Sequence, residues 1–203
     1  MDLSVRLSDL ELLEAVRDFA LGHPHPDVAR FGDAMTHWGD DWRAVGAQYL
    51  PAAELLSAAL ADAAEETYDL LALFERHRRE LRWEQSYRRE DALVPEEMLD
   101  GYGFAEIIGQ RGPFVSERIR AGIGVWGPGI VYPLHRHRAE EVYIPLAGTA
   151  EFVVGETAET TRTVGDVVHV DSGRAHGFRT TDRSLVVYYL WQAGDLRQTS
   201  TFG

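Results

Sequence analysis

Two sets of residues with fixed spacing, both between Gly129 and Thr180, constrain this chain more than any other feature. They combine regularly placed glycines with side chains that bind metal ions. The two sets read Gly129-x5-His135-x-His137-x3-Glu141-x6-Gly148 and Gly165-x5-Asp171-x-Gly173-x2-His176. These spacings indicate that three imidazoles and one carboxylate converge on a single divalent ion.

Strand geometry explains how the ligands of the first set come together. Side chains alternate between the two faces of a strand, so His135 and His137 point the same way. Glu141 and Tyr143 form a second pair with the same spacing. Residues 138–140 are expected to form the turn between the pairs, and His176 must arrive from a later strand.

The ligand types indicate a transition metal ion in a catalytic site. Imidazole and carboxylate suit zinc or iron(II) first, and also manganese, nickel or cobalt, whereas calcium and magnesium prefer shells made entirely of oxygen. Three histidines and one glutamate leave coordination positions open, which is typical of catalytic rather than structural sites. The alternative, a group of surface histidines in a charged turn, does not explain the joint spacing of Glu141 and His176.

Composition excludes several classes of partner. The chain has 203 residues and a net charge of −13, which argues against binding to nucleic acid or to an anionic membrane surface. It contains no run of 18 apolar residues that could span a bilayer and no cysteine that could form a disulfide or act as a nucleophile. Its first residues lead into an acidic amphipathic segment rather than a secretion signal, so a cytoplasmic location is expected.

The first hundred residues have helical patterns. Ser8-Asp9-Leu10-Glu11 has the form of a capping box, and apolar residues follow it with helical spacing, which predicts a helix over 8–22. Pro51 suits the first turn of a second, long helical segment that is expected to run to Trp83. Residues 1–100 are therefore predicted to be an α-helical region packed on a second part, 101–203.

From Gly101 onward the pattern becomes that of a mainly β fold. Short apolar or alternating runs are separated by Gly, Pro, Asp or Ser, as in antiparallel barrels and sandwiches. The predicted architecture is one antiparallel β-barrel carrying a helical N-terminal region. The runs expected to form strands are Phe104–Ile108, Arg118–Trp126, Glu141–Leu146, Ala150–Val154, Val167–Val170 and Leu185–Trp191.

The spaced sets match the two-part motif of the cupin superfamily, and neighbouring segments narrow the resemblance. The stretch Tyr132–Tyr143 resembles the core motif of the cupin-type dimethylsulfoniopropionate (DMSP) lyases, and Gly101–Glu106 and Gly124–Gly129 are also similar to that group. The resemblance covers most of the chain and is sharpest over 101–180. It implies a cupin-type barrel, also called a double-stranded β-helix or jelly roll, after an α-helical N-terminal portion, and it implies a homodimer.

The resemblance also implies a reaction and a set of roles. DMSP lyases use a metal-held substrate carboxylate and a tyrosine base to eliminate dimethyl sulfide and leave acrylate. Carried over to this sequence, the base becomes Tyr143, and aromatic residues near the site are expected to attract the positive sulfur. The implied metal ligands are His135, His137, Glu141 and His176, and the candidate substrate contacts are Tyr132, Trp126 and Tyr102, with Tyr188 and Tyr189 as further lining residues.

Three functions of different classes fit these observations. The first is the metal-dependent lyase, and Tyr143 favours it because oxygen chemistry needs no phenolate base at that position. The second is a cupin dioxygenase or isomerase that acts on another small carboxylate with the same ligands. The third is a non-catalytic cupin that binds a small ligand, which the complete set of four metal-competent side chains disfavours.

Overall fold

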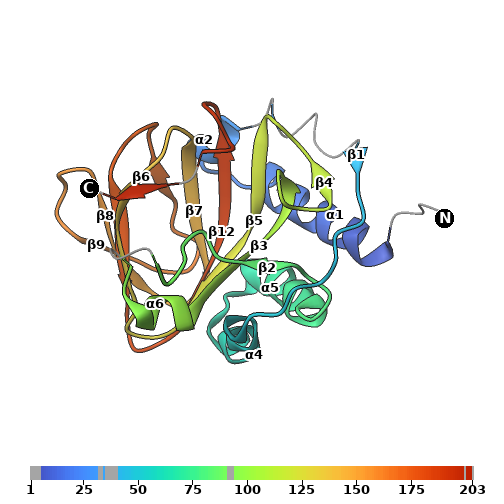
Figure 1. Cartoon of the computed structure of the whole chain (residues 1–203), viewed down its shortest axis with the longest axis horizontal. Helices are drawn as coiled ribbons and strands as arrows, with labels where there is room; N and C mark the ends of the chain where they lie inside the picture. The colour runs from blue at the N-terminus through green and yellow to red at the C-terminus, as the bar shows by residue number, and fades with distance from the viewer. Residues whose placement is uncertain (1–5, 32–33, 35–40, 91–93, 199, 203) are drawn as a thin grey trace.

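The chain forms a two-sheet antiparallel β-barrel with helices packed on one side (Figure 1). The computed structural model describes residues 6–31, 34, 41–90, 94–198 and 200–202. The larger sheet contains β1 (Asp41–Trp42), β2 (Trp83–Glu84), β3 (Tyr102–Gly109), β4 (Phe114–Val115), β5 (Ile119–Trp126), β7 (Glu140–Ala147), β10 (Val168–Val170) and β12 (Leu185–Gln192). The smaller sheet contains β6 (Val131–Arg136), β8 (Ala150–Val154), β9 (Thr160–Arg162), β11 (His176–Thr180) and β13 (Thr201–Phe202).

The strand order brings together segments that are far apart in the sequence. The larger sheet has the order β1-β4-β3-β5-β12-β7-β10, with β2 paired to β3, and the smaller sheet has the order β13-β6-β11-β8-β9. Within the described ranges the paired strands are antiparallel except β3 and β4, which run parallel. The mainly β, cupin-type barrel with helices at its N-terminal end is therefore confirmed, and β1 and β2 extend its larger sheet from the first hundred residues.

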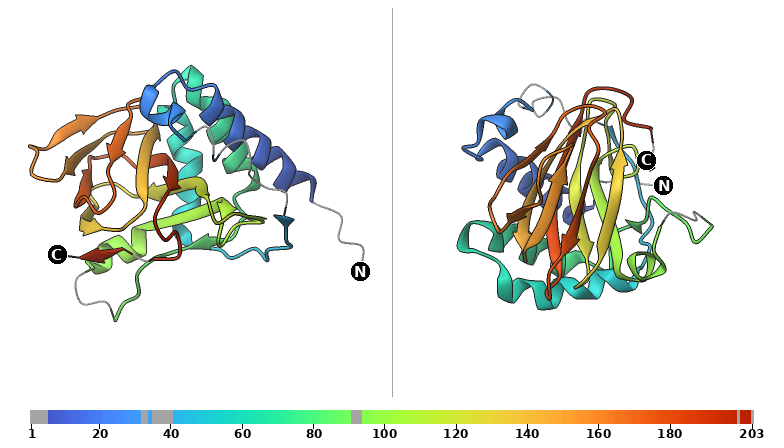
Figure 2. Two further views of the ribbon diagram at one scale, coloured as in Figure 1. Left: turned by 90° about the horizontal axis from the view of Figure 1, so that it is seen from above. Right: turned by 90° about the vertical axis from the view of Figure 1, so that its left-hand side faces the viewer.

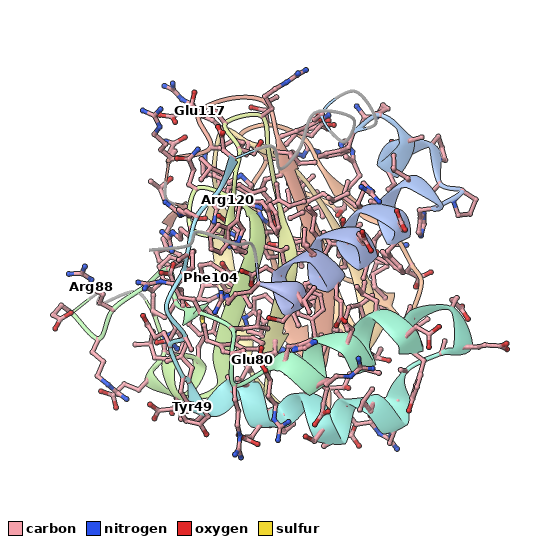
Figure 3. All side chains as sticks on the ribbon, turned by 90° about the vertical axis from the view of Figure 1, so that its right-hand side faces the viewer. Tyr49, Glu80, Arg88, Phe104, Glu117 and Arg120 are labelled. Atoms are coloured by element: carbon pink, nitrogen blue, oxygen red, sulfur yellow. The ribbon has the colours of Figure 1, made fainter. Side chains whose placement is uncertain are left out.

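Helices cover the outer face of the larger sheet, as Figures 2 and 3 show from three further directions. Helix α1 packs against β3, and α5 packs against β7. Among the described residues no helix has the length and apolar character needed to cross a membrane. The helical segments are α1 (Leu7–Leu21), α2 (Pro26–Ala29), α4 (Leu55–Ala59), α5 (Glu65–His77), α6 (Glu96–Gly101) and the 3-10 turns η1 (Pro51–Glu54) and η2 (Leu60–Asp62).

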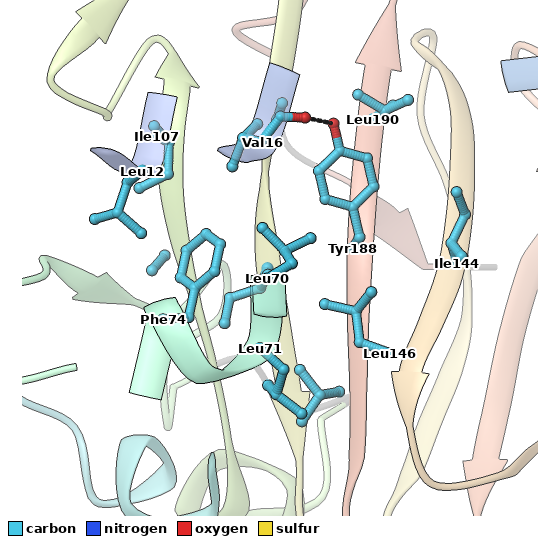
Figure 4. Close-up of a cluster of buried hydrophobic side chains, with 14 of the residues drawn as sticks. Leu12, Val16, Leu70, Leu71, Phe74, Ile107, Ile144, Leu146, Tyr188 and Leu190 are labelled. Carbon is cyan, nitrogen blue, oxygen red and sulfur yellow. Dashed lines mark hydrogen bonds between the residues drawn. The ribbon is translucent and has the colours of Figure 1, made fainter. Parts of the chain in front are cut away.

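Strand β12 shows how the two faces of the larger sheet are used. Tyr188 and Leu190 belong to the apolar layer under the helices, whereas Val187 and Tyr189 belong to the barrel interior. The Tyr188 hydroxyl donates a hydrogen bond of 3.0 Å to the Val16 carbonyl in α1 (Figure 4). Strand alternation thus separates a face that holds the helices from a face that lines the barrel. The expectation that Tyr188 lines the site is wrong for this reason.

Two expectations about the helical region need correction. Helix α1 forms as predicted, but its N-cap is Arg6 and Ser8 lies inside the first turn, so the capping box is not formed. Side-chain contacts fix this end instead, because the Asp9 carboxylate accepts hydrogen bonds of 2.9 Å from the nearby Arg6 and from the Trp42 indole, which is distant in the sequence.

The long helix expected from Pro51 to Trp83 is broken near Ala63. There Ala63 forms a β-bridge with Ala147, and Thr67 Oγ1 accepts a bond from the Ala64 N–H and donates one of 2.8 Å to the Leu146 carbonyl. Pairing with β7 therefore outweighs helix propensity at this point.

Candidate metal centre and active site

Three buried histidines meet inside the barrel. His135 is the penultimate residue of β6, His137 follows that strand, and His176 begins β11, where it lies directly opposite His135 in the strand register. One ring nitrogen from each histidine lies within 4.8 Å of those of the others, and the residues are only 1–3% exposed. The ligand segments predicted from the sequence are therefore adjacent in space.

Backbone contacts fix the orientation of all three rings. In each histidine Nδ1 lies within hydrogen-bond distance of a carbonyl oxygen two residues away in the chain. A neutral ring that donates through Nδ1 keeps a lone pair on Nε2, which is the form that binds a metal ion. The accepting carbonyls are those of Pro133 at 2.9 Å, Ala139 at 2.9 Å and Arg174 at 3.0 Å.

Glu141 completes the group from β7. Its Oε2 lies 2.8 Å from His137 Nε2 and 3.1 Å from His176 Nε2. Because the Nδ1 atoms of these rings already donate, a neutral imidazole would present a lone pair to the carboxylate. Two acceptors at such distances need a cation between them, either a proton or a metal ion.

The electrostatics of the site favour the metal-binding protonation states. Burial alone would raise the pKa of Glu141, but the adjacent His137 and His176 rings hold it well below its usual range. Burial, reinforced by His176, lowers the pKa of His135 to about 3. At neutral pH the carboxylate is therefore ionised and the His135 ring is neutral. His135 Nε2 is buried and has no hydrogen-bond partner within the described part of the chain.

The donor set fits a divalent transition metal. Imidazole nitrogens with a single carboxylate match the ligand preference of zinc, iron(II), manganese, nickel or cobalt. A cation held between them would give a partner to the orphaned Nε2 of His135 and to the facing acceptors of His137 and Glu141.

Tyr143 lies beside this group on the same strand. It points into the barrel two residues after Glu141, is 4% exposed, and its ring centroid is 6.0 Å from that of His176. Burial and the negative charge of Glu141 hold the pKa of Tyr143 well above its ordinary value. Without a cation the phenol is therefore protonated, and a nearby positive charge would favour its ionised form.

The aromatic residues predicted as substrate contacts form one cluster next to the histidines. The Tyr132 ring lies 4.4 Å from the His135 ring and 5.4 Å from the Trp126 ring, centroid to centroid. Tyr102 stacks on Trp126 at 6.1 Å, while its hydroxyl accepts hydrogen bonds from the backbone N–H groups of Ser86 and Tyr87. Trp126 Nε1 is buried without a hydrogen-bond partner among the described residues.

A β-bulge explains how Tyr132 and His135 face the same way despite odd spacing. His176 pairs with His135 and Phe178 pairs with Tyr132, so β6 carries one more residue than β11 between these positions. Pro133 and Leu134 occupy the bulge, which turns Tyr132 into the barrel.

The sequence did not reveal the residues that pack against the His137 ring. The Trp191 ring stacks on the His137 ring at 4.0 Å, and the Arg120 guanidinium lies 4.6 Å from the Trp191 ring centroid. Arg120 in turn forms a buried ion pair of 2.5 Å with Glu106. The only sequence signal was the apolar strand around Trp191, which does not reveal its pairing with Glu141.

The buried ion pair gives a prediction about stability. Arg120→Met should lower the free energy of unfolding by about 3–5 kcal/mol, because Glu106 would keep a buried charge without its partner. The Arg120 and Glu106 side chains are 9% and 1% exposed. The matched control is Arg197→Met, which breaks an ion pair with Glu117 whose side chains are 68% and 70% exposed, and should cost less than about 1 kcal/mol. Urea unfolding measures both, and equal losses would contradict the prediction.

Comparisons with known proteins agree on one family. A family model described as dimethylsulfoniopropionate lyase matches residues 29–187 of this chain. The curated dimethylsulfoniopropionate lyase DddQ of Ruegeria pomeroyi is 35% identical over 114 residues, which cover 56% of this chain and 55% of that protein. The chain thus matches about half the length of this relative.

Solved structures extend the similarity to nearly the whole chain. The crystal structure of DMSP lyase DddQ from Ruegeria pomeroyi is 27% identical, with a TM-score of 0.84, and the match covers 98% of this chain and 97% of that one. A chain solved in work on the DMSP lyases RdDddP and RnDddQII is 25% identical, with the same TM-score of 0.84 and coverage of 98% and 100%.

Proposed function

Because this chain belongs to the dimethylsulfoniopropionate lyase family, we propose that it cleaves DMSP to dimethyl sulfide and acrylate by a metal-dependent β-elimination. One observation carries the proposal beyond family membership. Tyr143 and Glu141 project from the same face of β7 into a barrel where Glu141 contacts His137 and His176. A candidate base and a candidate metal site thus adjoin each other, as an elimination next to a carboxylate requires.

The proposed ligands of the metal are His135, His137, His176 and Glu141. A divalent ion held there would draw the substrate carboxylate and stabilise the negative charge that develops on it when the neighbouring carbon loses a proton. The protein's contribution is to present the ligands in the right form. Contacts from Nδ1 to backbone carbonyls orient the imidazoles, and burial keeps His135 neutral.

Tyr143 is the proposed general base. Its phenolate oxygen takes the proton from the carbon next to the carboxylate, and the electrons of that C–H bond form the double bond of acrylate. The C–S bond breaks at the same time, and its electron pair leaves with neutral dimethyl sulfide. Burial of Tyr143 excludes water, so the proton passes to the protein rather than to solvent.

The aromatic cluster of Trp126, Tyr132 and Tyr102 is the proposed site for the sulfonium end of the substrate. The faces of aromatic rings attract cations, and indole does so most strongly. The cluster adjoins the proposed metal ligands through the contact between the Tyr132 and His135 rings. A substrate with a carboxylate at one end and a cation at the other can therefore contact both groups at once.

This assignment predicts a selective effect of Trp126→Leu. The KM for DMSP should rise about 2- to 30-fold, because one cation–π contact is lost. Inhibition by acrylate, which has no sulfonium, should change much less. Steady-state assays with and without acrylate measure both values, and an equal weakening of both would show that the indole does not contact the positive end.

The alternatives are a cupin dioxygenase or isomerase and a non-catalytic binding protein, and one experiment separates them. Protein loaded with zinc or iron(II) is incubated with DMSP while headspace dimethyl sulfide and dissolved oxygen are followed together. The lyase releases dimethyl sulfide at the same rate with and without oxygen. Oxygen uptake without dimethyl sulfide would instead support a dioxygenase, and the absence of both signals would support an isomerase of another carboxylate or a binding protein.

A further inference from the structure

Tyr189 has a buried hydroxyl that the proposed reaction does not use. The residue is 6% exposed, and its hydroxyl has no hydrogen-bond partner in the described part of the chain. A buried polar group without a partner costs free energy, so native proteins rarely keep one without a reason. A hydrogen bond to the bound substrate would be one such reason.

The position of Tyr189 places it within the site rather than in the structural core. It lies on β12 directly opposite Tyr143 of β7 in the strand register, and both residues belong to the apolar cluster of the barrel interior. Its ring meets that of Phe104 edge to face at a centroid distance of 6.4 Å. Tyr189 therefore faces the same space as the candidate base.

The charged groups around Tyr189 are already engaged with others. Glu106 Oε1 accepts from the Arg111 N–H at 2.5 Å, and Oε2 accepts from Arg120 Nε at 2.5 Å. Glu141 Oε2 lies against His137 and His176. The charged groups around the Tyr189 hydroxyl thus have other partners. None of them forms a hydrogen bond with this hydroxyl within the described residues.

Tyr189 is suited to donate rather than to ionise. Burial, together with the negative charge of Glu106, holds its pKa well above the ordinary value of a phenol. A neutral phenol that lacks a partner offers an O–H donor, and an anionic carboxylate is the strongest acceptor that a substrate can bring.

We propose that Tyr189 is a substrate-binding residue whose hydroxyl donates a hydrogen bond to the carboxylate of the bound substrate. This inference rests on the proposed function in that it takes a small carboxylate as the substrate. Two tyrosines that lie opposite each other on neighbouring strands then have different roles. Tyr143 moves the proton, and Tyr189 holds the group next to the carbon from which the proton is taken.

The test is Tyr189→Phe, which removes one oxygen and keeps the ring. The KM for DMSP should rise about 10- to 100-fold with little change in kcat, because a hydrogen bond to a charged group is lost both before and during the reaction. Titration calorimetry with acrylate on metal-loaded protein should show a loss of affinity of the same order. The unfolding midpoint in urea should not fall, since the hydroxyl has no partner to lose among the described residues.

The neighbouring residue supplies a matched control. Tyr188→Phe makes the same change one position earlier on β12, but on the face that packs against α1, where the hydroxyl bonds to Val16. It should lower the unfolding midpoint and leave both KM and acrylate affinity unchanged. Tyr189→Phe should therefore weaken binding without lowering stability, and Tyr188→Phe should lower stability without weakening binding.

Several outcomes would overturn the inference. Unchanged acrylate affinity in Tyr189→Phe would do so, and so would a rise in KM for DMSP without weaker acrylate binding, which would locate the contact at the sulfonium end. A wild-type protein that binds acrylate but releases no dimethyl sulfide would refute the proposed function while the acrylate titrations still decide the role of Tyr189. A wild type that neither binds acrylate nor acts on DMSP would refute both.

Discussion

Replacing Tyr143 with phenylalanine should lower kcat for dimethyl sulfide release by about 10²- to 10⁴-fold, the range expected when a general base is lost. The substitution removes the oxygen that takes the proton and keeps the ring, whose centroid lies 6.0 Å from that of Phe152 and 6.2 Å from that of Phe178. Packing inside the barrel should therefore survive. Initial rates at saturating DMSP measure the effect.

Metal content decides how a slow Tyr143→Phe variant is interpreted. Tyr143 follows the proposed ligand Glu141 by two residues on β7, so the variant could lose activity by losing metal rather than a base. The metal bound per chain should therefore be measured on the samples used for kinetics. A variant with full metal content and wild-type kcat would refute the role of Tyr143 as the base.

Loss of a proposed metal ligand is the second change with a large expected effect. His137→Ala should reduce bound metal to a small fraction of one ion per chain and lower the rate by more than about 100-fold, since changes outside the ligand shell alone cost 10- to 100-fold in affinity or activity. The residue is 3% exposed, and its Nε2 lies 2.8 Å from Glu141, so its loss removes a donor from the centre of the site.

Chelation and a control histidine complete this experiment. Wild-type protein treated with a chelator should lose activity and unfold at a lower temperature, because an ion bound only by the folded state stabilises that state. Adding back zinc, iron(II), manganese, nickel or cobalt identifies the ions that restore it. His77→Ala, on α5 beside Glu11, should keep both metal and activity. Full activity after complete chelation would contradict a metal-dependent mechanism.

The fold was predictable where patterns are local. The six predicted β segments correspond to β3, β5, β7, β8, β10 and β12, because alternation and flanking turn residues mark strands within one stretch of sequence. The break at Ala63 depends on Thr67 reaching the Leu146 carbonyl, a contact between segments far apart in the chain. Short strands such as β9 and β13 exist only because a neighbouring strand pairs with them.

The same distinction applies to the site. His135, His137, Glu141 and Tyr143 lie in one short stretch, so their spacing alone indicates that they share a face. Tyr188 and Tyr189 cannot be separated in this way, since β12 is buried on both faces and shows no polar alternation. Their roles follow from packing. The first contacts a helix, and the second faces the barrel interior.

We expect the metal-loaded chain to convert DMSP to equal amounts of acrylate and dimethyl sulfide. Proton NMR of one sample, sealed without oxygen, follows the vinyl protons of acrylate and the methyl protons of dimethyl sulfide together. Both products should grow in a ratio of one to one with metal-loaded wild-type protein and stay absent after chelation. Fully metal-loaded wild-type protein that leaves DMSP intact would contradict this expectation.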